Sequence, residues 1–356
     1  MVGSLNSYVY AFNFERMNAL IKDRDSLLKL TDLPKPLVHK DDDVLIQVKA
    51  TGICGTDIHI LRGEYPAKSG IILGHESSGI VEEIGRRVKN VKVGDRVILD
   101  PTYHCGTCSY CQSDRPNYCV EKSHTETGVS KDGTFAEYHV TPANFLHHLP
   151  DEMSFETATL TEPLACVLNG LKQARIAPGS RVLVTGAGPM GLLFGLAASS
   201  LSCEVTVGDV SDYRVKQAQS LFSDVQNYST QDILSQNKER KFDMAIDASG
   251  KSLEDLLQLM AKGGKILTAG LDYSHEARIK PSYLTDNGLS IIGSIDSNLT
   301  FEPAIKMLKT NPTFRKIITH TFPITDYKQA FQVLGLDLTT MQRRDINAGK
   351  VVILPS

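Results

Sequence analysis

A glycine-rich turn constrains the fold of this 356-residue chain more than any other feature. Residues 184–191 read VTGAGPMG, a G-x-G-x-x-G pattern with an apolar run on either side. Between a strand and a helix, the first glycine permits a tight turn, the second lets the backbone approach a pyrophosphate, and the third lets the helix pack on the strand. The pattern therefore predicts a dinucleotide-binding unit. Its expected cofactor contacts are Gly186, Gly188, Pro189, Met190 and Gly191.

An acid after the next apolar run indicates which dinucleotide binds. Asp209 ends an expected strand and lies 18 residues beyond Gly191. A carboxylate about 20 residues beyond the motif bonds the adenosine ribose and repels the 2′-phosphate of NADP, so we predict NAD. Arg214 is either a contact to the adenine or ribose of that cofactor or an exposed arginine at a helix start.

The order of apolar segments predicts one domain inserted in another. Residues 1–165 alternate short β-branched runs with turn residues, which is typical of an all-β barrel. Residues 166–300 alternate strands with helix-length segments, as in a doubly wound parallel sheet of the Rossmann type. Residues 301–356 begin helical and end in an apolar strand that suits the first domain. We expect strands at 181–185, 205–209, 242–247, 265–269, 289–293 and 349–354, and helices at 190–201 and 252–261.

Four of the seven cysteines are clustered with the spacing C-x2-C-x2-C-x7-C. Two-residue loops bend each sulfur back toward a common centre, so that four thiolates surround one ion. In a cytosolic protein such a cluster indicates metal rather than disulfides. We predict a closed, structural zinc site at Cys105, Cys108, Cys111 and Cys119.

A second candidate metal site combines separated segments. Cys54 lies in the segment GICGTDIH, and His75 and Glu76 end the segment ILGHE. A catalytic zinc takes three protein ligands and keeps one open place, which a thiolate, an imidazole and a carboxylate fit. Glu162, in the segment TEPL, is a further acid near this ion. Each residue alone is more commonly a core or surface residue, so the prediction rests on their combination.

These motifs, in this order and spacing, resemble those of the medium-chain, zinc-dependent alcohol dehydrogenases, and within them the sorbitol and threonine dehydrogenase branch. The resemblance implies a GroES-like fold for the first domain. It also implies a catalytic zinc at Cys54, His75 and Glu76, with Glu162 either bound to the ion or holding its water. The resemblance covers essentially the whole chain, through CGTDIH, GHE, VGDRV, the four cysteines, EPL and the glycine motif.

The resemblance implies the chemistry as well. A secondary alcohol would pass a hydride to NAD and become a ketone, while zinc lowers the pKa of the alcohol. Thr56 would bond the alcohol oxygen, and His59 would pass the proton to solvent through the cofactor ribose. The expected catalytic residues are thus Thr56, His59 and Glu76.

Two departures from the sorbitol dehydrogenase pattern bear on the substrate. Ile60 stands where that enzyme has a tyrosine, and Asp296 stands where a substrate-binding arginine is expected. Asp296 would then contact an amino alcohol or an altered hydroxyl pattern; the alternative is that it caps a turn or faces solvent. We expect a polyol or sugar-derived alcohol as substrate, with L-threonine or another amino alcohol as the alternative.

Composition limits the remaining classes of function. The chain has 38 Lys plus Arg against 41 Asp plus Glu, and no apolar run of the ~20 residues that a membrane helix requires. No basic cluster adjoins the cysteines, which argues against a zinc-finger regulator. A structural NAD-binding protein or a zinc-free quinone reductase would lack metal ligands that this chain retains. We expect a cytoplasmic homo-oligomer, a dimer or tetramer, that acts on a small-molecule alcohol and binds neither nucleic acid nor membrane.

Overall fold

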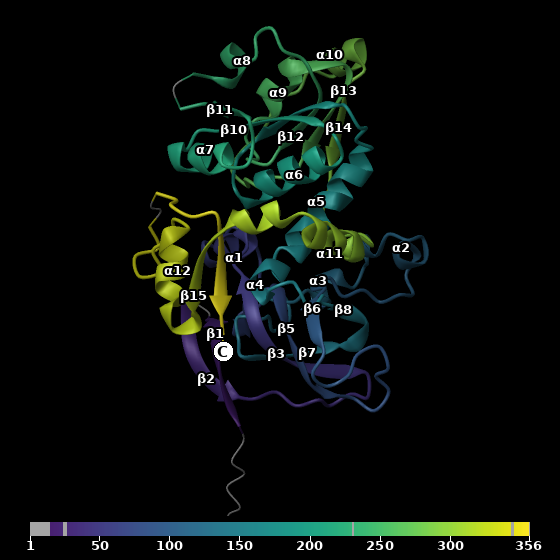
Figure 1. The fold of residues 1–356 in the computed structure, drawn as a ribbon, viewed down its shortest axis with the longest axis vertical. Coiled ribbons are helices and arrows are strands. Elements are labelled where there is room, and N and C mark those ends of the chain that lie inside the picture. The colour runs from purple at the N-terminus through teal and green to yellow at the C-terminus, as the bar shows by residue number, and fades with distance from the viewer. Residues whose placement is uncertain (1–14, 24–26, 230, 343–344, 356) are drawn as a thin grey trace, which may run out of the picture.

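The computed structural model describes residues 15–23, 27–229, 231–342 and 345–355, which form two connected parts (Figure 1). The β-rich part contains the N-terminal strands and the last strand of the chain, and the α/β part contains the middle of the chain. Helices α5 (Thr161–Ala174) and α11 (Phe301–Thr310) lie where the two parts meet.

The α/β part is built on a six-stranded sheet with the strand order β11-β10-β9-β12-β13-β14, and all its pairings are parallel. Val182, Leu183 and Val184 of the central strand are fully buried, because helices cover both faces of a parallel sheet. The strands are β9 (Arg181–Thr185), β10 (Glu204–Asp209), β11 (Asp224–Asn227), β12 (Phe242–Asp247), β13 (Met260–Thr268) and β14 (Ser290–Gly293). The helices are α6 (Pro189–Ser200), α7 (Asp212–Gln219), α8 (Ile233–Gln236), α9 (Leu253–Leu259) and α10 (Pro281–Asn287).

The predicted strands and helices of this part are confirmed apart from the end of one helix, and helices α7, α8 and α10 were not among the predictions. The helix expected over 252–261 ends at Leu259, because Met260 already pairs with Phe242 at the start of β13. Strand β11 was not predicted, since its sequence DVQN has a single apolar residue and no alternation. Its position at the sheet edge, beside β10 alone, explains how so polar a strand is tolerated.

The β-rich part contains a seven-stranded sheet and a three-stranded sheet. The larger sheet has the order β15-β16-β3-β5-β6-β8, with β7 also paired to β3, and the smaller has the order β2-β1-β4. The strands are β1 (Arg16–Lys22), β2 (Leu28–Pro34), β3 (Asp43–Gly52), β4 (Ile71–Ile72), β5 (Glu76–Ile84), β6 (Arg96–Leu99), β7 (Tyr138–Pro142), β8 (Leu146–His148), β15 (Ile318–Pro323) and β16 (Lys350–Leu354).

The last strand returns to the first part of the chain, as the sequence predicts. Strand β16 pairs with β3 through Val352 and Ile353, so the α/β part is inserted within the β-rich part. Helix α5 runs without a break across residue 165, where the sequence places the end of the first domain. That domain boundary stays a prediction.

The expectation of an all-β first domain was wrong in detail, because the β-rich part also holds short helices. The α-helices are α1 (Gly55–Leu61), α2 (Ser109–Gln112), α3 (Lys122–Thr125), α4 (Phe155–Ala158) and α12 (Tyr327–Val333). The described residues also form 3-10 helices at Pro116–Tyr118, Ala143–Phe145, Pro312–Ile317 and Ile324–Asp326. Helices this short are set by capping and tertiary contacts rather than by a hydrophobic period that sequence would reveal.

One hydrophobic core joins the two parts. It includes Leu164 and Leu171 of α5, Ile305 of α11, and Ile98 of the β-rich sheet together with Val182 of β9. Because these side chains pack in one cluster, α5 is held against both sheets and gives the junction a rigid frame. In the part of the chain that the structure describes, no helix is both long and apolar enough to span a membrane.

His139 makes the stability of the β-rich part depend on pH. Burial lowers the pKa of His139 to about 4 from its usual 6.5. The unfolded chain therefore binds this proton first as pH falls, and the folded state loses about 1.4 kcal/mol per pH unit between pH 6.5 and 4. From pH 7 to pH 5, urea unfolding should show about 2 kcal/mol more loss in the wild type than in His139→Gln. Equal losses in the two proteins would show that His139 is not buried neutral.

Candidate metal and cofactor site

The N-terminus of α1 positions Cys54. The Cys54 sulfur accepts the backbone N–H of Thr56, and Asp57 Oδ2 accepts the backbone N–H of Cys54 at 2.9 Å, which forms a capping box. The other oxygen of Asp57 accepts the backbone N–H of Gly74 at 3.2 Å. One fully buried carboxylate thus ties the segment of Cys54 to the segment of His75. Asp57 lies inside the CGTDIH motif, but sequence reasoning assigned it no role.

Cys54, His75 and Glu76 converge as the sequence predicts. One ligand atom from each of the three side chains lies within 4.8 Å of the others. His75 and Glu76 are buried, and His75 Nδ1 has no hydrogen-bond partner, with Asp57 Oδ1 3.9 Å away. A thiolate, an imidazole and a carboxylate are the donor set of a zinc site, so these residues fit the expected ion.

The charges around His75 favour a cation at this position. Burial alone lowers the pKa of His75, yet Cys54, Asp57 and Glu162 hold that pKa well above its ordinary value. Anionic side chains packed this closely stabilise a positive charge among them. A divalent ion bound by Cys54, His75 and Glu76 would supply that charge.

Lys350 is a functional residue that sequence reasoning missed. This lysine begins β16, is 4% exposed, and forms an ion pair with Glu76 Oε2. Burial opposes the charge of Lys350, but Glu76 and Cys54 raise its pKa above the ordinary value. Lys350 thus fixes one oxygen of Glu76 and leaves the other for the ion. No local motif marks Lys350, because the two residues come from opposite ends of the chain.

Glu162 lies beside the three converging ligands but outside their group. It stands in the first turn of α5, and its Oε1 accepts the Cys166 thiol at 3.3 Å. Burial raises the pKa of Glu162 to about 7, although His75 lowers it in part. A carboxyl group with this pKa holds or releases a proton near neutrality, which suits a group close to a reacting alcohol.

The two expected relay residues lie on α1. The Thr56 hydroxyl is 3.6 Å from the Cys54 sulfur, so the structure brings Thr56 to the metal site. His59 lies further along the helix, with Nδ1 2.7 Å from Glu64 Oε2. Ile60 is 1% exposed and packs in the core of the β-rich part, so this departure from the sorbitol dehydrogenase pattern places no side chain at the site.

Asp296 is neither exposed nor isolated. It forms an ion pair with Lys122, with both side chains largely buried. Its backbone carbonyl accepts the amide of Asn169, which lies on α5 two turns beyond Glu162. Asp296 also raises the pKa of the Cys166 thiol, after burial and Glu162, so its carboxylate lies near the metal-site acids. Sequence reasoning had no signal for the pairing with Lys122.

The four clustered cysteines come together as the predicted second metal site requires. Their sulfur atoms lie within 4.8 Å of one another. The separations are 3.5 Å for Cys108 and Cys111, 3.9 Å for Cys105 and Cys111, and 4.0 Å for Cys108 and Cys119. Four sulfurs around a tetrahedral zinc with bonds of about 2.3 Å would lie about 3.8 Å apart. All four cysteines are free of disulfides, and hydrogen bonds from Thr107 and the Cys108 N–H lower the pKa of Cys105 to about 6.

The glycine motif forms the turn between β9 and α6. Gly186 has φ +95°, and a Cβ on Gly191 would lie 1.7 Å from the Gly186 carbonyl oxygen. Gly188 is the N-cap of α6 and Pro189 is its first residue, where no N–H is needed. The backbone N–H groups of Met190 and Gly191 in the same turn have no helical carbonyl as partner. This turn therefore has the backbone that a pyrophosphate requires.

Asp209 and Arg214 lie beside this turn. Asp209 is buried at the end of β10, where Oδ2 accepts the Ala187 N–H at 2.7 Å. Arg214 Nη1 is 3.6 Å from the same oxygen, and a Cβ on Gly188 would lie 3.5 Å from the Arg214 guanidinium carbon. Arg214 is therefore not an exposed arginine. Its guanidinium covers the turn, where a bound ribose would lie.

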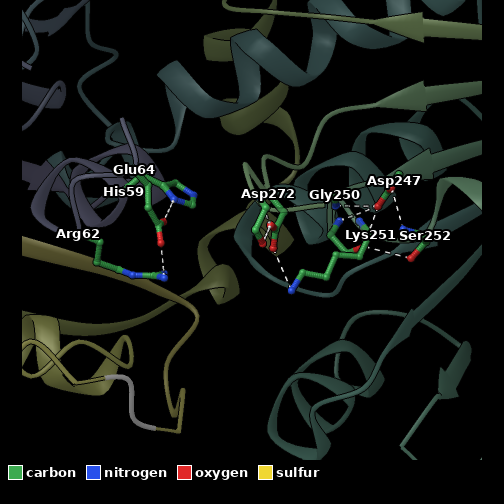
Figure 2. Close-up of polar contacts among 10 residues, drawn as sticks. His59, Arg62, Glu64, Asp247, Gly250, Lys251, Ser252 and Asp272 are labelled. Carbon is green, nitrogen blue, oxygen red and sulfur yellow. Dashed lines mark hydrogen bonds and ion pairs between the residues drawn. The ribbon is translucent and has the colours of Figure 1, made fainter. Parts of the chain in front are cut away.

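Two further loops at this edge of the sheet were not assigned from the sequence (Figure 2). Asp247 ends β12 and accepts the backbone N–H groups of Gly250 at 2.8 Å and Ser252 at 3.0 Å. Lys251 forms a 2.9 Å ion pair with Asp272, which follows β13. Ligands of doubly wound sheets bind at the carboxyl ends of the strands, so these loops flank the cofactor turn.

Two family models match the chain, the alcohol dehydrogenase GroES-like domain over residues 40–151 and the zinc-binding dehydrogenase over residues 189–310. A curated sorbitol dehydrogenase of Halalkalibacterium halodurans is 32% identical over 89% of this chain and 96% of its own length. The chain therefore belongs to the zinc-dependent, medium-chain alcohol dehydrogenase family. This confirms the family, the fold class and the enzyme class that the sequence predicts.

Other relatives differ in substrate. A D-altritol 5-dehydrogenase of Agrobacterium fabrum is 34% identical over 88% of this chain and 94% of its own. An L-threonine 3-dehydrogenase of Shewanella baltica is 32% identical over 86% of this chain and 92% of its own. Several relatives thus show the family, but they are named for different alcohol substrates.

Two solved structures resemble this one and contain nicotinamide cofactors. A zinc-binding dehydrogenase of Sinorhizobium meliloti 1021 with bound NADP has a TM-score of 0.87 at 26% identity, covering 96% of this chain and 100% of its own. An Escherichia coli CFT073 protein described as a short chain alcohol dehydrogenase, in complex with NADH, has a TM-score of 0.86 at 28% identity, covering 95% and 99%. The cofactor class is thereby supported, and the choice between the two dinucleotides falls to Asp209.

Removing one ligand should abolish turnover at the first metal site and lower stability at the second. Cys54→Ala should lose one of two zinc ions per chain and all turnover, yet remain folded and bind NADH, because the fold positions the other ligands without the ion. Cys108→Ser should also lose one ion, but should lower the unfolding temperature while the remaining folded molecules keep their turnover. Metal analysis, thermal unfolding and NADH titration check both variants. Full activity in Cys54→Ala, or unchanged zinc and stability in Cys108→Ser, would contradict the assignments.

Asp209→Ala should narrow the preference for NAD over NADP. From its place at the end of β10 we predict that the Asp209 carboxylate bonds the adenosine ribose and repels a 2′-phosphate, so its removal should lift a repulsion that acts on NADP alone. The ratio of kcat/KM for the two cofactors measures the change. A wild-type enzyme that prefers NADP would refute the prediction.

Proposed function

We propose that this dehydrogenase oxidises a polyol or sugar-derived secondary alcohol to the corresponding ketone with NAD. The observation that carries the proposal is the convergence of Cys54, His75 and Glu76 within 4.8 Å, in a chain that also forms the dinucleotide turn. Relatives named sorbitol dehydrogenase and D-altritol 5-dehydrogenase support the substrate class.

In this proposal the site residues have separate roles in binding the ion, orienting the alcohol and moving the proton. A zinc ion held by Cys54, His75 and Glu76 would lower the pKa of the alcohol, and NAD would accept the hydride. Thr56 accepts a hydrogen bond from the alcohol and so orients its hydroxyl. His59 then carries the proton toward solvent. Lys350 keeps Glu76 in place, because their ion pair is buried.

The Lys122–Asp296 pair argues for a neutral substrate rather than a cationic one. Asp296 already pairs with Lys122, so the ammonium group of an amino alcohol would compete with Lys122 for this carboxylate, whereas its remaining acceptor sites can bind a neutral hydroxyl. Glu126 also lies beside Lys122, and burial raises the pKa of Glu126, which favours its uncharged form. Groups of this kind donate and accept hydrogen bonds, as several hydroxyls of a polyol require. L-Threonine remains the alternative substrate, because two relatives of this chain are named L-threonine 3-dehydrogenase.

The assembly and location of the enzyme belong to the same proposal. Strand β14 is at the edge of the sheet, and Ile295 and Leu299 after it are exposed, which suits a homo-oligomer, a dimer or tetramer. Free cysteines throughout the described residues suit a reducing compartment such as the cytoplasm.

Asp296→Asn tests the substrate class. On a panel of polyols, inositols, amino alcohols and simple secondary alcohols, the wild type should form NADH fastest with a polyol. The variant should lose roughly ten- to more than a hundredfold in kcat/KM for that polyol, since a charge-assisted hydrogen bond contributes about 1.5 to 3 kcal/mol. A simple secondary alcohol should be oxidised as before. The exposed Asp286→Asn is the matched control. A wild type that prefers threonine, or an unchanged variant, would overturn the assignment.

A further inference from the structure

We infer that Glu64 is the positioning residue for His59, and that it fixes which imidazole nitrogen takes the proton. The inference rests on the proposed function for the part played by His59. Figure 2 shows Glu64 between His59 and Arg62. One oxygen, Oε2, is 2.7 Å from His59 Nδ1, and the other, Oε1, forms an ion pair with Arg62.

The backbone after α1 is folded so that Glu64 must lie beside His59. The backbone N–H of Glu64 donates to the His59 carbonyl at 2.8 Å, and that of Tyr65 donates to the same oxygen at 3.2 Å. Gly63, directly before Glu64, has φ +70°, which a glycine adopts without strain. These backbone hydrogen bonds therefore place Glu64 beside His59.

The hydrogen bond determines the tautomer of the imidazole. A carboxylate only accepts, so Nδ1 must carry the hydrogen that it donates to Glu64. Nε2 is then the basic nitrogen. A proton leaving the alcohol would bond to Nε2, while the Nδ1–H bond remains intact, and would then pass from Nε2 to water.

His59 also faces the α/β part across the junction. The ring of Tyr273 meets the His59 ring edge-on, with centroids 5.5 Å apart, and lies 6.2 Å from the ring of Tyr65. Tyr273 follows Asp272, whose partner Lys251 flanks the cofactor turn. On its own side His59 meets Glu64, which also pairs with Arg62, and on the other side it meets Tyr273, beside which Glu126 also lies.

The alternative is that Glu64 merely forms a surface ion pair with Arg62. Such a pair would act on the turn alone and would not require His59 Nδ1 at hydrogen-bond distance. The two roles differ in what Glu64→Ala and Arg62→Gln should do, because only the first removes the acceptor of His59.

The main experiment is a double-mutant cycle on the best alcohol of the wild type. Glu64→Ala should lower kcat by roughly ten- to hundredfold, with KM and NADH affinity unchanged, since general acid–base groups contribute factors of this order or more. Glu64→Gln keeps an acceptor for Nδ1 and should recover part of the loss. In the His59→Ala background, Glu64→Ala should cost nothing further. Arg62→Gln and the exposed control Glu83→Gln should stay within about twofold of the wild type.

A second measurement does not depend on activity. Nitrogen NMR of the His59 side chain, at a pH where imidazole is neutral, should show the Nδ1–H tautomer in the wild type and a mixture of tautomers in Glu64→Ala. Losses that multiply in the double variant, an Arg62→Gln variant as slow as Glu64→Ala, or an Nε2–H tautomer in the wild type would each overturn the inference. If the wild type oxidises no alcohol while the tautomer is as expected, the proposed function fails and the positioning by Glu64 stands.

Discussion

Buried negative charge at the junction of the two parts is the constraint on which the site depends. Asp57, Glu76 and Glu162 are carboxyl groups withdrawn from water, and an uncompensated buried charge is costly. Backbone N–H groups donate to Asp57, Lys350 pairs with Glu76, and burial raises the pKa of Glu162 to about 7, so that part of its charge is lost near neutrality. What remains is the need for a cation beside Cys54, and a zinc ion meets that need.

This constraint explains why distant segments must meet before the site exists. Cys54 starts α1, His75 and Glu76 lie at the start of β5, and Lys350 comes from β16 near the chain end. The insertion of the α/β part between these segments brings α5, with Glu162, to the same place. The closed cysteine lobe has the opposite character, because its four ligands come from a short stretch of sequence and require little of the rest of the fold.

The same contrast decides how much could be predicted from the sequence. The glycine turn, Asp209 and the cysteine cluster are set by short-range geometry, since spacing alone fixes where their groups point. The site at Cys54, His75 and Glu76 was recognised because its motifs occur together. Pairings across the fold were not predicted, as with Glu76 and Lys350 or Asp296 and Lys122, because opposite charges far apart in sequence have many candidate partners. Strand β11 was missed for want of a periodic pattern, and the end of α9 was missed because the pairing of Met260 with Phe242 across the sheet sets it.

In the proposed function, helix α5 links recognition of the substrate to the chemistry. Asp296 has φ +54°, a conformation that a non-glycine residue keeps only when its surroundings hold it. Asn169 provides that hold, since its amide donates to the carbonyl oxygens of Ile295 and Asp296. Because Asn169 and Glu162 lie on one rigid helix, the carboxylate beside the metal ligands and the ion pair with Lys122 keep a constant separation. An alcohol held at both places would therefore be selected by its length and by the positions of its hydroxyls as well as by its charge.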